Sequence, residues 1–207
     1  YNIDIEYGER MKVLDTWAGV YFSPVQSFQW LREKNYSRAA LASLITVGLA
    51  FGFFLSACLS HGFFPSVIGS SILLFLLISL LTSIFYLLFS RFFGGKASFW
   101  KLYQVCSLSY LPFLPALALL APFSWTYMFD ITWYGGGPLY PLLCISAGVI
   151  WCWVLSVFGV REVTGMSTAK AFITTLLSGA LLIAVSFVGL AIGVMLYFDL
   201  FNILMSK

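Results

Sequence analysis

The residues from Ile72 to Phe89 read ILLFLLISLLTSIFYLLF, and no acidic or basic side chain lies between His61 and Arg91. A helix needs about 18–20 apolar residues to cross the hydrocarbon core of a bilayer. This run is apolar on every side, so a helix made from it has no face for water. The pattern therefore predicts a transmembrane helix rather than a buried helix of a large soluble core.

Four further apolar runs have the length of a membrane span. The sequence predicts an all-α, polytopic membrane protein with five transmembrane helices, at about 39–60, 68–90, 102–121, 139–160 and 171–198. An N-terminal segment, 1–38, precedes this membrane domain, 39–207. Charged residues make up 9% of the chain, whereas soluble domains are about one quarter charged. This composition excludes a water-soluble globule, and the net charge of +3 is too small to indicate a nucleic-acid partner.

Small residues recur in the first and last predicted spans. They let helix backbones approach closely in lipid, where no hydrophobic force operates between spans. The first span contains Ala39, Ala40, Ala42, Ser43, Gly48, Ala50 and Gly52, and the fifth contains Gly179, Gly189 and Gly193. We expect contacts between helices at these positions.

The third predicted span contains two prolines, Pro112 and Pro115. Each proline removes a backbone donor and clashes with the preceding turn, so we expect a helix break there. The carbonyl groups freed by a break need another helix, a hydroxyl or water, and Ser107, Ser109 and Tyr110 are nearby candidates. The break is either a static kink or a moving part beside an internal pocket.

The segment before the first span combines aromatic and basic residues. Ser23 and Pro24 predict a helix start, with Ser23 as the cap and Gln26 as its capping-box partner. Aromatic residues around this start and basic residues after it are typical of a helix lying on the membrane surface. We therefore expect an interfacial helix over about 23–34. The alternative is an ordinary soluble helix packed under a loop.

Basic residues are distributed unevenly among the connections. Arg10, Lys12, Arg32, Lys34 and Arg38 precede the first span, Arg91, Lys96 and Lys101 lie between the second and third, and Arg161 and Lys170 lie between the fourth and fifth. The two opposite loops contain no lysine or arginine, and Lys207 alone remains for that side. Because lysine and arginine concentrate on the cytoplasmic side, we expect a cytoplasmic N-terminus and an external C-terminus.

The same basic residues are candidate contacts for a ligand or a partner. Anionic lipid headgroups attract basic clusters beside transmembrane helices, and an acidic protein surface would do the same. The candidates are Arg32, Lys34, Arg38, Arg91, Lys96, Lys101, Arg161 and Lys170. The alternative is that these charges only orient the protein in the membrane.

The residues with reactive side chains give weak signals. Cys58, Cys106, Cys144 and Cys152 lie in or beside apolar runs without a metal-ligand spacing, so we expect them to pack as small hydrophobic residues. We expect no metal and no cofactor.

Catalysis has one formal candidate. Ser167 and Lys170 match the S-x-x-K pattern of some acyl-transfer enzymes. However, a lysine acts as a base only when it is desolvated, and these two residues fall in a polar loop predicted over 161–170. We therefore expect no catalytic residue.

One long connection, 122–141, is rich in tryptophan and tyrosine. Such residues concentrate at the boundary between bilayer and water. We expect a loop or a short re-entrant segment there, on the side away from the basic loops. Asp130, its one acidic residue, is interpreted as an exposed loop carboxylate.

Four segments carry a family resemblance. They are Trp17–Phe28, Gly94–Lys101, Tyr110–Pro112 and Val160–Ala171. In order and spacing they resemble the Yip family of membrane proteins (Ypt/Rab-interacting), particularly its bacterial-type branch, and they cover nearly all of residues 15–200. The resemblance implies five spans, a cytoplasmic N-terminus and no known catalysis.

The resemblance also implies a class of function. Eukaryotic members are tied to vesicle traffic and Rab binding, but the Asp-Leu-Tyr-Gly-Pro motif of those members is not found here, so we do not expect a Rab partner. Bacterial members are often encoded near ABC-type exporters. We therefore expect an adaptor or accessory subunit in a bacterial inner membrane, with a membrane-protein partner or a second copy of the chain. The alternative is a small transporter or permease with a path at the Pro112/Pro115 break.

Overall fold

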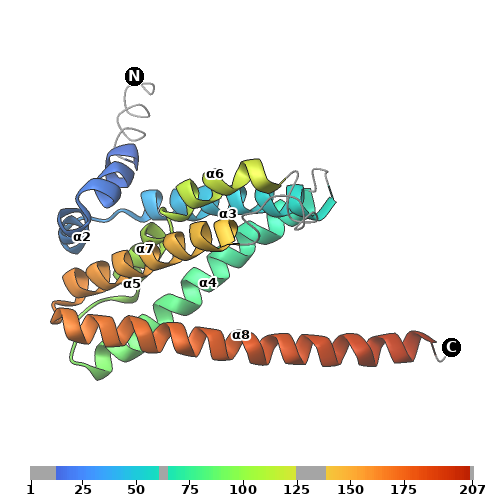
Figure 1. The fold of residues 1–207 in the computed structure, drawn as a ribbon. Helices are drawn as coiled ribbons and strands as arrows, with labels where there is room; N and C mark the ends of the chain where they lie inside the picture. The colour runs from blue at the N-terminus through green and yellow to red at the C-terminus, as the bar shows by residue number, and fades with distance from the viewer. Residues whose placement is uncertain (1–12, 61–64, 125–138, 206–207) are drawn as a thin grey trace, which may run out of the picture.

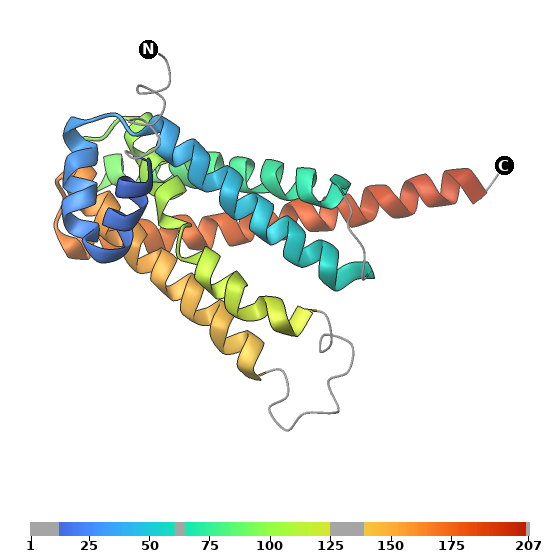
Figure 2. The same ribbon diagram turned by 90° about the horizontal axis from the view of Figure 1, so that it is seen from above.

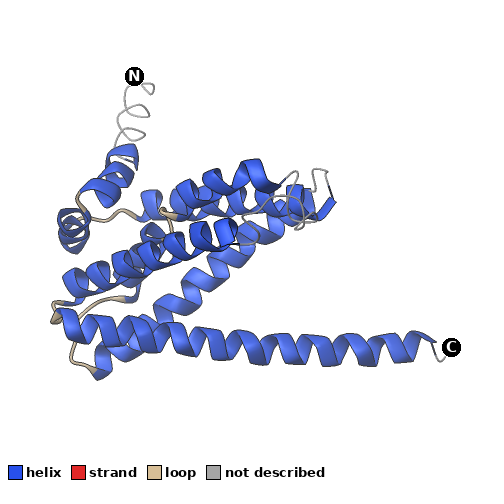
Figure 3. Ribbon diagram, viewed as in Figure 1, coloured by secondary structure: helices blue, strands red, loops and turns tan. Residues whose placement is uncertain are grey.

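The computed structural model describes residues 13–60, 65–124 and 139–205, and in these ranges every regular element is a helix (Figure 3). Residues 13–22 form a first helix, which the non-helical Ser23 separates from α2. The later helices are α2 (Pro24–Glu33), α3 (Ser37–Ser60), α4 (Pro65–Phe92), α5 (Phe99–Ser109), α6 (Phe113–Ser124), α7 (Leu139–Thr164) and α8 (Thr168–Met205). The prediction of an all-α chain is confirmed.

Among the residues that the structure describes, five helical stretches are long and apolar enough to span a membrane. They lie in α3, α4, α5 with α6, α7 and α8, in the order that the sequence predicts. The predicted break in the third span is also confirmed, because α5 ends at Ser109 and α6 begins at Phe113.

The predicted polar loop at 161–170 is wrong in extent. Arg161 and Glu162 belong to the last turn of α7, and Lys170 belongs to the first turn of α8. Gly165 ends α7: its N–H donates to the carbonyl oxygen of Arg161 at 2.9 Å, and its φ of +72° suits glycine. A single left-handed residue therefore makes the turn, and the flanking polar residues stay helical.

Helix α4 ends in a similar way. Gly94 has a φ of +83°, its N–H donates to Arg91, and the N–H of Gly95 donates to the carbonyl oxygen of Ser90. These paired bonds are those of a Schellman motif. The pair Gly94 and Gly95 predicts a turn in the sequence between the second and third spans, and the structure confirms it.

Helices α3 and α4 approach each other closely at two glycines. A Cβ atom added to Gly48 would lie 2.8 Å from Cα of Ile72, and one added to Gly52 would lie 2.7 Å from Cα of Ile68. The expectation of helix contacts is confirmed at these two positions. In α8 it is wrong, because nothing described lies within 4 Å of a Cβ added to Gly179 or Gly189. The surroundings of Gly193 lie outside the described residues.

Figures 1 and 2 show how the helices are arranged. Helices α3 to α7 and the first part of α8 form a bundle, and α2 lies across one of its ends. The chain connections α2–α3, α4–α5 and α7–α8 all lie at that end. The last part of α8 projects beyond the other helices at the opposite end, and the helix continues to Met205 and not only to about 198 as predicted.

The junction before α2 differs from the predicted capping box. Helix α2 begins at Pro24 as expected, but the side chain of Ser23 makes no capping hydrogen bond. Instead, the N–H of Ser23 donates to Gly19 and its carbonyl oxygen accepts from Ser27, at 2.7 and 3.0 Å. Ser23 therefore joins two helices through its main chain, and its side chain is left exposed.

Candidate functional site

At the helix break between α5 and α6, a residue distant in the sequence donates a hydrogen bond to a carbonyl oxygen that proline leaves without its helical partner. An N–H at Pro115 would have bonded to the carbonyl oxygen of Leu111, four residues earlier. That oxygen instead accepts the hydroxyl of Tyr21, which lies 90 residues earlier, and the N–H of Leu114 at 2.9 Å. The carbonyl oxygen freed by Pro112, that of Leu108, accepts the N–H of Leu111 at 3.2 Å.

Two of the three residues expected to satisfy the break, Ser107 and Ser109, do not do so. The hydroxyls of Ser107 and Ser109 donate to the carbonyl oxygens of Tyr103 and Val105, inside α5. A serine hydroxyl in a helix reaches the carbonyl one turn earlier more easily than one beyond the helix end. The sequence gives no specific signal for Tyr21, because it is one of several aromatic residues before the first span.

Tyr21 keeps its proton under physiological conditions. Burial, with a smaller contribution from Cys152, raises the pKa of Tyr21 to about 12. Because this folded-state pKa lies above the usual value of 10.0, the protonated hydroxyl favours folding at every pH below about 10. The stability that this raised pKa contributes should fall as the pH rises from about 10 to about 12.

The break is surrounded by packed side chains. Leu108 and Leu111 are fully buried, and the hydroxyl of Ser43 on α3 donates to the carbonyl oxygen of Ser107 at 2.9 Å. A hydroxyl pair, Ser79 and Ser107 at 3.2 Å, joins α4 to α5. These contacts hold the break between α3 and α4 and favour the static kink over the moving part.

Helix α2 is docked on the bundle through one face. Phe28 and Leu31 are buried, together with Val20 of the first helix. Phe28 lies against Gly159 of α7, where an added Cβ would come within 3.2 Å of its ring. The opposite face is open, with Trp30 57% exposed. This one-sided burial suits a helix at a membrane surface, and its position there stays a prediction.

The link after α2 is tied to α5 by polar side chains. The ammonium group of Lys101 donates to the carbonyl oxygens of Leu31 and Lys34. Gln104 accepts from the N–H of Tyr36 at 3.3 Å and donates to Asn35 at 2.6 Å. Lys101 thus binds the negative end of α2, a role that the sequence did not indicate.

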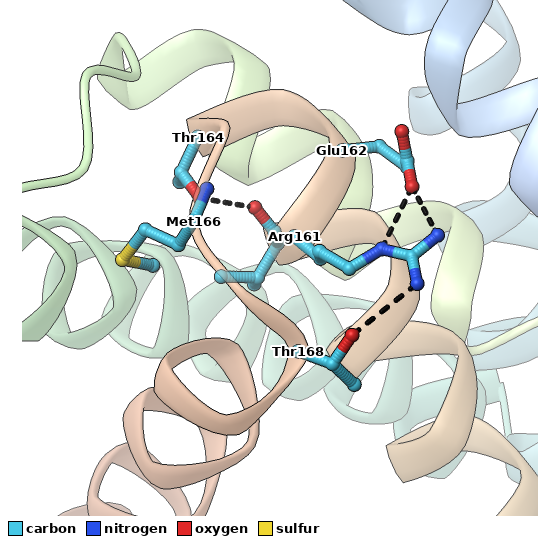
Figure 4. Close-up of polar contacts among 6 residues, drawn as sticks. Arg161, Glu162, Thr164, Met166 and Thr168 are labelled. Atoms are coloured by element: carbon cyan, nitrogen blue, oxygen red, sulfur yellow. Dashed lines mark hydrogen bonds and ion pairs between the residues drawn. The ribbon is translucent and has the colours of Figure 1, made fainter.

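The α4–α5 connection and the α7–α8 connection are joined to each other by hydrogen bonds. The N–H of Lys96 donates to the carbonyl oxygen of Thr164, and Lys170 donates to that of Phe93, at 3.2 and 3.3 Å. Figure 4 shows Arg161 turned toward Glu162, with which it forms an ion pair, and toward Thr168, 3.3 Å away across the turn.

All eight predicted basic residues therefore lie at one end of the bundle, which we call the basic end. It consists of Arg32, Lys34, Arg38, Arg91, Lys96, Lys101, Arg161 and Lys170. Lys101, Arg161 and Lys170 bond to protein atoms. Arg32, Lys34, Arg91 and Lys96 are exposed, and no polar partner among the described residues binds their side chains.

The remaining candidates are placed as follows. Ser167 is exposed, and its carbonyl oxygen accepts the N–H of Ala171 at the start of α8. Cys106 and Cys152 are buried free thiols, and Cys144 is a half-buried one. Some of the predictions fall outside the described residues. They concern His61, Asp130, residues 125 to 138 of the predicted segment 122–141, and the surroundings of Cys58.

The helices and their composition define a multi-pass integral membrane protein. The sequence profile of the Yip1 domain matches residues 18–201, so the chain belongs to the Yip family. No curated protein and no solved structure gives a match.

Proposed function

We propose that this member of the Yip family is a non-enzymatic adaptor or accessory subunit. In this role its basic end contacts lipid headgroups and the acidic surface of a membrane-protein partner. The resemblance to the bacterial-type branch favours a bacterial inner membrane and a partner of the ABC-exporter class. A second copy of the chain is the other candidate partner.

The main support for this proposal is that three chain connections, α2–α3, α4–α5 and α7–α8, all lie at the basic end. Segments far apart in the sequence are held there by direct bonds, among them Lys101 to Leu31 and Lys170 to Phe93. The bonds fix a surface on which Arg32, Arg91 and Lys96 stay exposed. A rigid surface with free positive charge binds an acidic partner without first paying the entropy of ordering its loops.

The buried polar groups support this role over catalysis and transport. The hydroxyls of Thr82, Ser83 and Ser156 donate to carbonyl oxygens within their own helices. They satisfy the backbone, and Thr82 and Ser83 also lie beside the buried thiol of Cys106. A thiol buried in apolar surroundings is unreactive. At the Pro112/Pro115 break, the buried Leu108 and Leu111 occupy the level that a solute path would need.

The test is recovery of the partner from membranes. The tagged chain is cross-linked in native membranes, extracted in mild detergent and compared with the variant Lys96→Glu. We expect one membrane protein, or a second copy, in stoichiometric amount with the wild type, and severalfold less with Lys96→Glu. The matched control is Ser66→Glu, which adds a negative charge at an exposed site at the opposite end. Repeated recovery of the chain alone would refute the proposal.

A further inference from the structure

A cavity of about 620 Å³ lies at the basic end among the first helix, α2 and the start of α3. Its lining includes Asp15 from the first helix, Trp30 and Lys34 from α2 and its end, and Tyr36, Ser37 and Arg38 from the link and α3. The volume is within the range of about 300–1,000 Å³ usual for small-ligand sites. The cavity therefore has room for a polar headgroup.

The walls of this cavity are held in place by contacts between the helices. The indole N–H of Trp17 donates to the carbonyl oxygen of Ala39 at 3.3 Å, which ties the first helix to α3. Gly19 lies so close to the buried Ser27 that an added Cβ would come within 2.5 Å of its hydroxyl oxygen. The site is thus formed before any ligand enters.

Acidic and basic side chains both line this cavity. Asp15 and Lys34 are exposed, and neither forms an ion pair with a described residue. Arg38 adds a second positive charge, and the first turn of α3 adds the positive end of a helix dipole. The arrangement fits a zwitterion, with an anionic group near Lys34 and Arg38 and a cationic group near Asp15.

The position of the cavity points to the membrane surface. The first membrane-spanning stretch begins at Ser37, which is itself part of the cavity lining. Trp30 and Tyr36 are of the aromatic types that concentrate at the level of lipid headgroups. Their rings also attract a cation.

We propose that this cavity binds the phosphoethanolamine headgroup of a membrane phospholipid. The phosphate lies toward Lys34, Arg38 and the start of α3, and the ammonium group lies toward Asp15 and the aromatic rings. This deepens the lipid contact of the proposed function. It requires no protein partner, so lipid binding and partner recovery succeed or fail separately.

The test counts lipids bound to the full chain in nonionic detergent by native mass spectrometry. Phosphatidylethanolamine and phosphatidylglycerol are supplied in mixed micelles of equal lipid content. We expect the wild type to prefer phosphatidylethanolamine. Lys34→Gln should weaken its binding about fivefold, as expected for one basic residue at a membrane surface, and Asp15→Asn should remove the preference between the two lipids.

Two controls make the outcome decisive. Ser66→Glu makes the same change of one unit in net charge at an exposed site at the opposite end, outside the cavity, and it should leave binding unchanged. Soluble glycerophosphoethanolamine should bind more weakly than the lipid. Equal binding of the two lipids by the wild type, or equal loss in Ser66→Glu and Lys34→Gln, would overturn the proposal. Equal binding of the soluble ester would overturn its assignment to a membrane lipid.

Discussion

The apolar helices α3, α5 and α6 are packed differently from the apolar helix α8. Buried residues make up 61% of the span formed by α5 and α6, but only 22% of the span in α8. Gly48 and Gly52 bring α3 against α4, whereas Gly179 and Gly189 of α8 face open space. A small residue in an apolar helix therefore permits a close approach, but its partner helix is decided elsewhere in the chain.

The largest effect should follow from filling the contact between α3 and α4. Leucine at position 48 or 52 would place its Cβ against the backbone of Ile72 or Ile68, and overpacking of this kind costs about 1–3 kcal/mol. We expect Gly48→Leu and Gly52→Leu each to lower the unfolding free energy by roughly 2 kcal/mol in SDS titrations of detergent-purified protein, followed by circular dichroism. Unchanged unfolding curves would show that the two helices are not in contact.

The second-largest loss of stability should follow from removing the hydrogen bond between Tyr21 and Leu111. Tyr21→Phe removes the hydroxyl donated to Leu111, and a bond of this kind contributes about 1 kcal/mol. The difference from wild type should be constant below about pH 10 and shrink toward pH 12, because the pKa of Tyr21 is raised to about 12. The control is Tyr36→Phe, whose hydroxyl has no hydrogen bond among the described residues. Equal losses in the two variants would contradict the assigned contact.

A smaller effect is expected at the link after α2. Lys101→Met leaves the carbonyl oxygens of Leu31 and Lys34 without the ammonium group, at a cost of about 0.5 kcal/mol for a charge at a helix end. We expect faster tryptic cleavage after Lys34, measured by mass spectrometry under native conditions. Lys96→Met is the control and should cleave at the wild-type rate there. If Lys101→Met is also cleaved after Lys34 at the wild-type rate, the hydrogen bonds of Lys101 do not restrain the segment after α2.

The smallest effect is expected in α8. Gly179→Leu meets no described atom within 4 Å, and substitutions away from contacts usually change stability by about 0.5 kcal/mol or less. Its unfolding curve should overlay that of the wild type under the conditions used for Gly48→Leu. A loss as large as that of Gly48→Leu would remove the contrast between the two parts of the molecule.

Local features of the chain were the ones that the sequence predicted well. The five apolar runs, the turn at Gly94 and the break at Pro112 depend on neighbouring residues or on the identity of one residue. The helix at 13–22 and the bond from Tyr21 to Leu111 depend on tertiary packing across 90 residues, and no periodic pattern encodes that distance. The same holds for Lys101, whose charge predicted the correct end of the bundle but not its bond to α2.

The most direct test of the central claim is the labelling of single cysteines from either side of the membrane. In a chain whose four native cysteines are replaced by alanine, Ser98→Cys places a thiol at the exposed basic end and Ser66→Cys places one at the exposed opposite end. With an impermeant maleimide, we expect labelling of Ser66→Cys in intact cells and of Ser98→Cys only after the membrane is opened. Labelling of both thiols from the same side would contradict the account of five spans with the basic end in the cytoplasm.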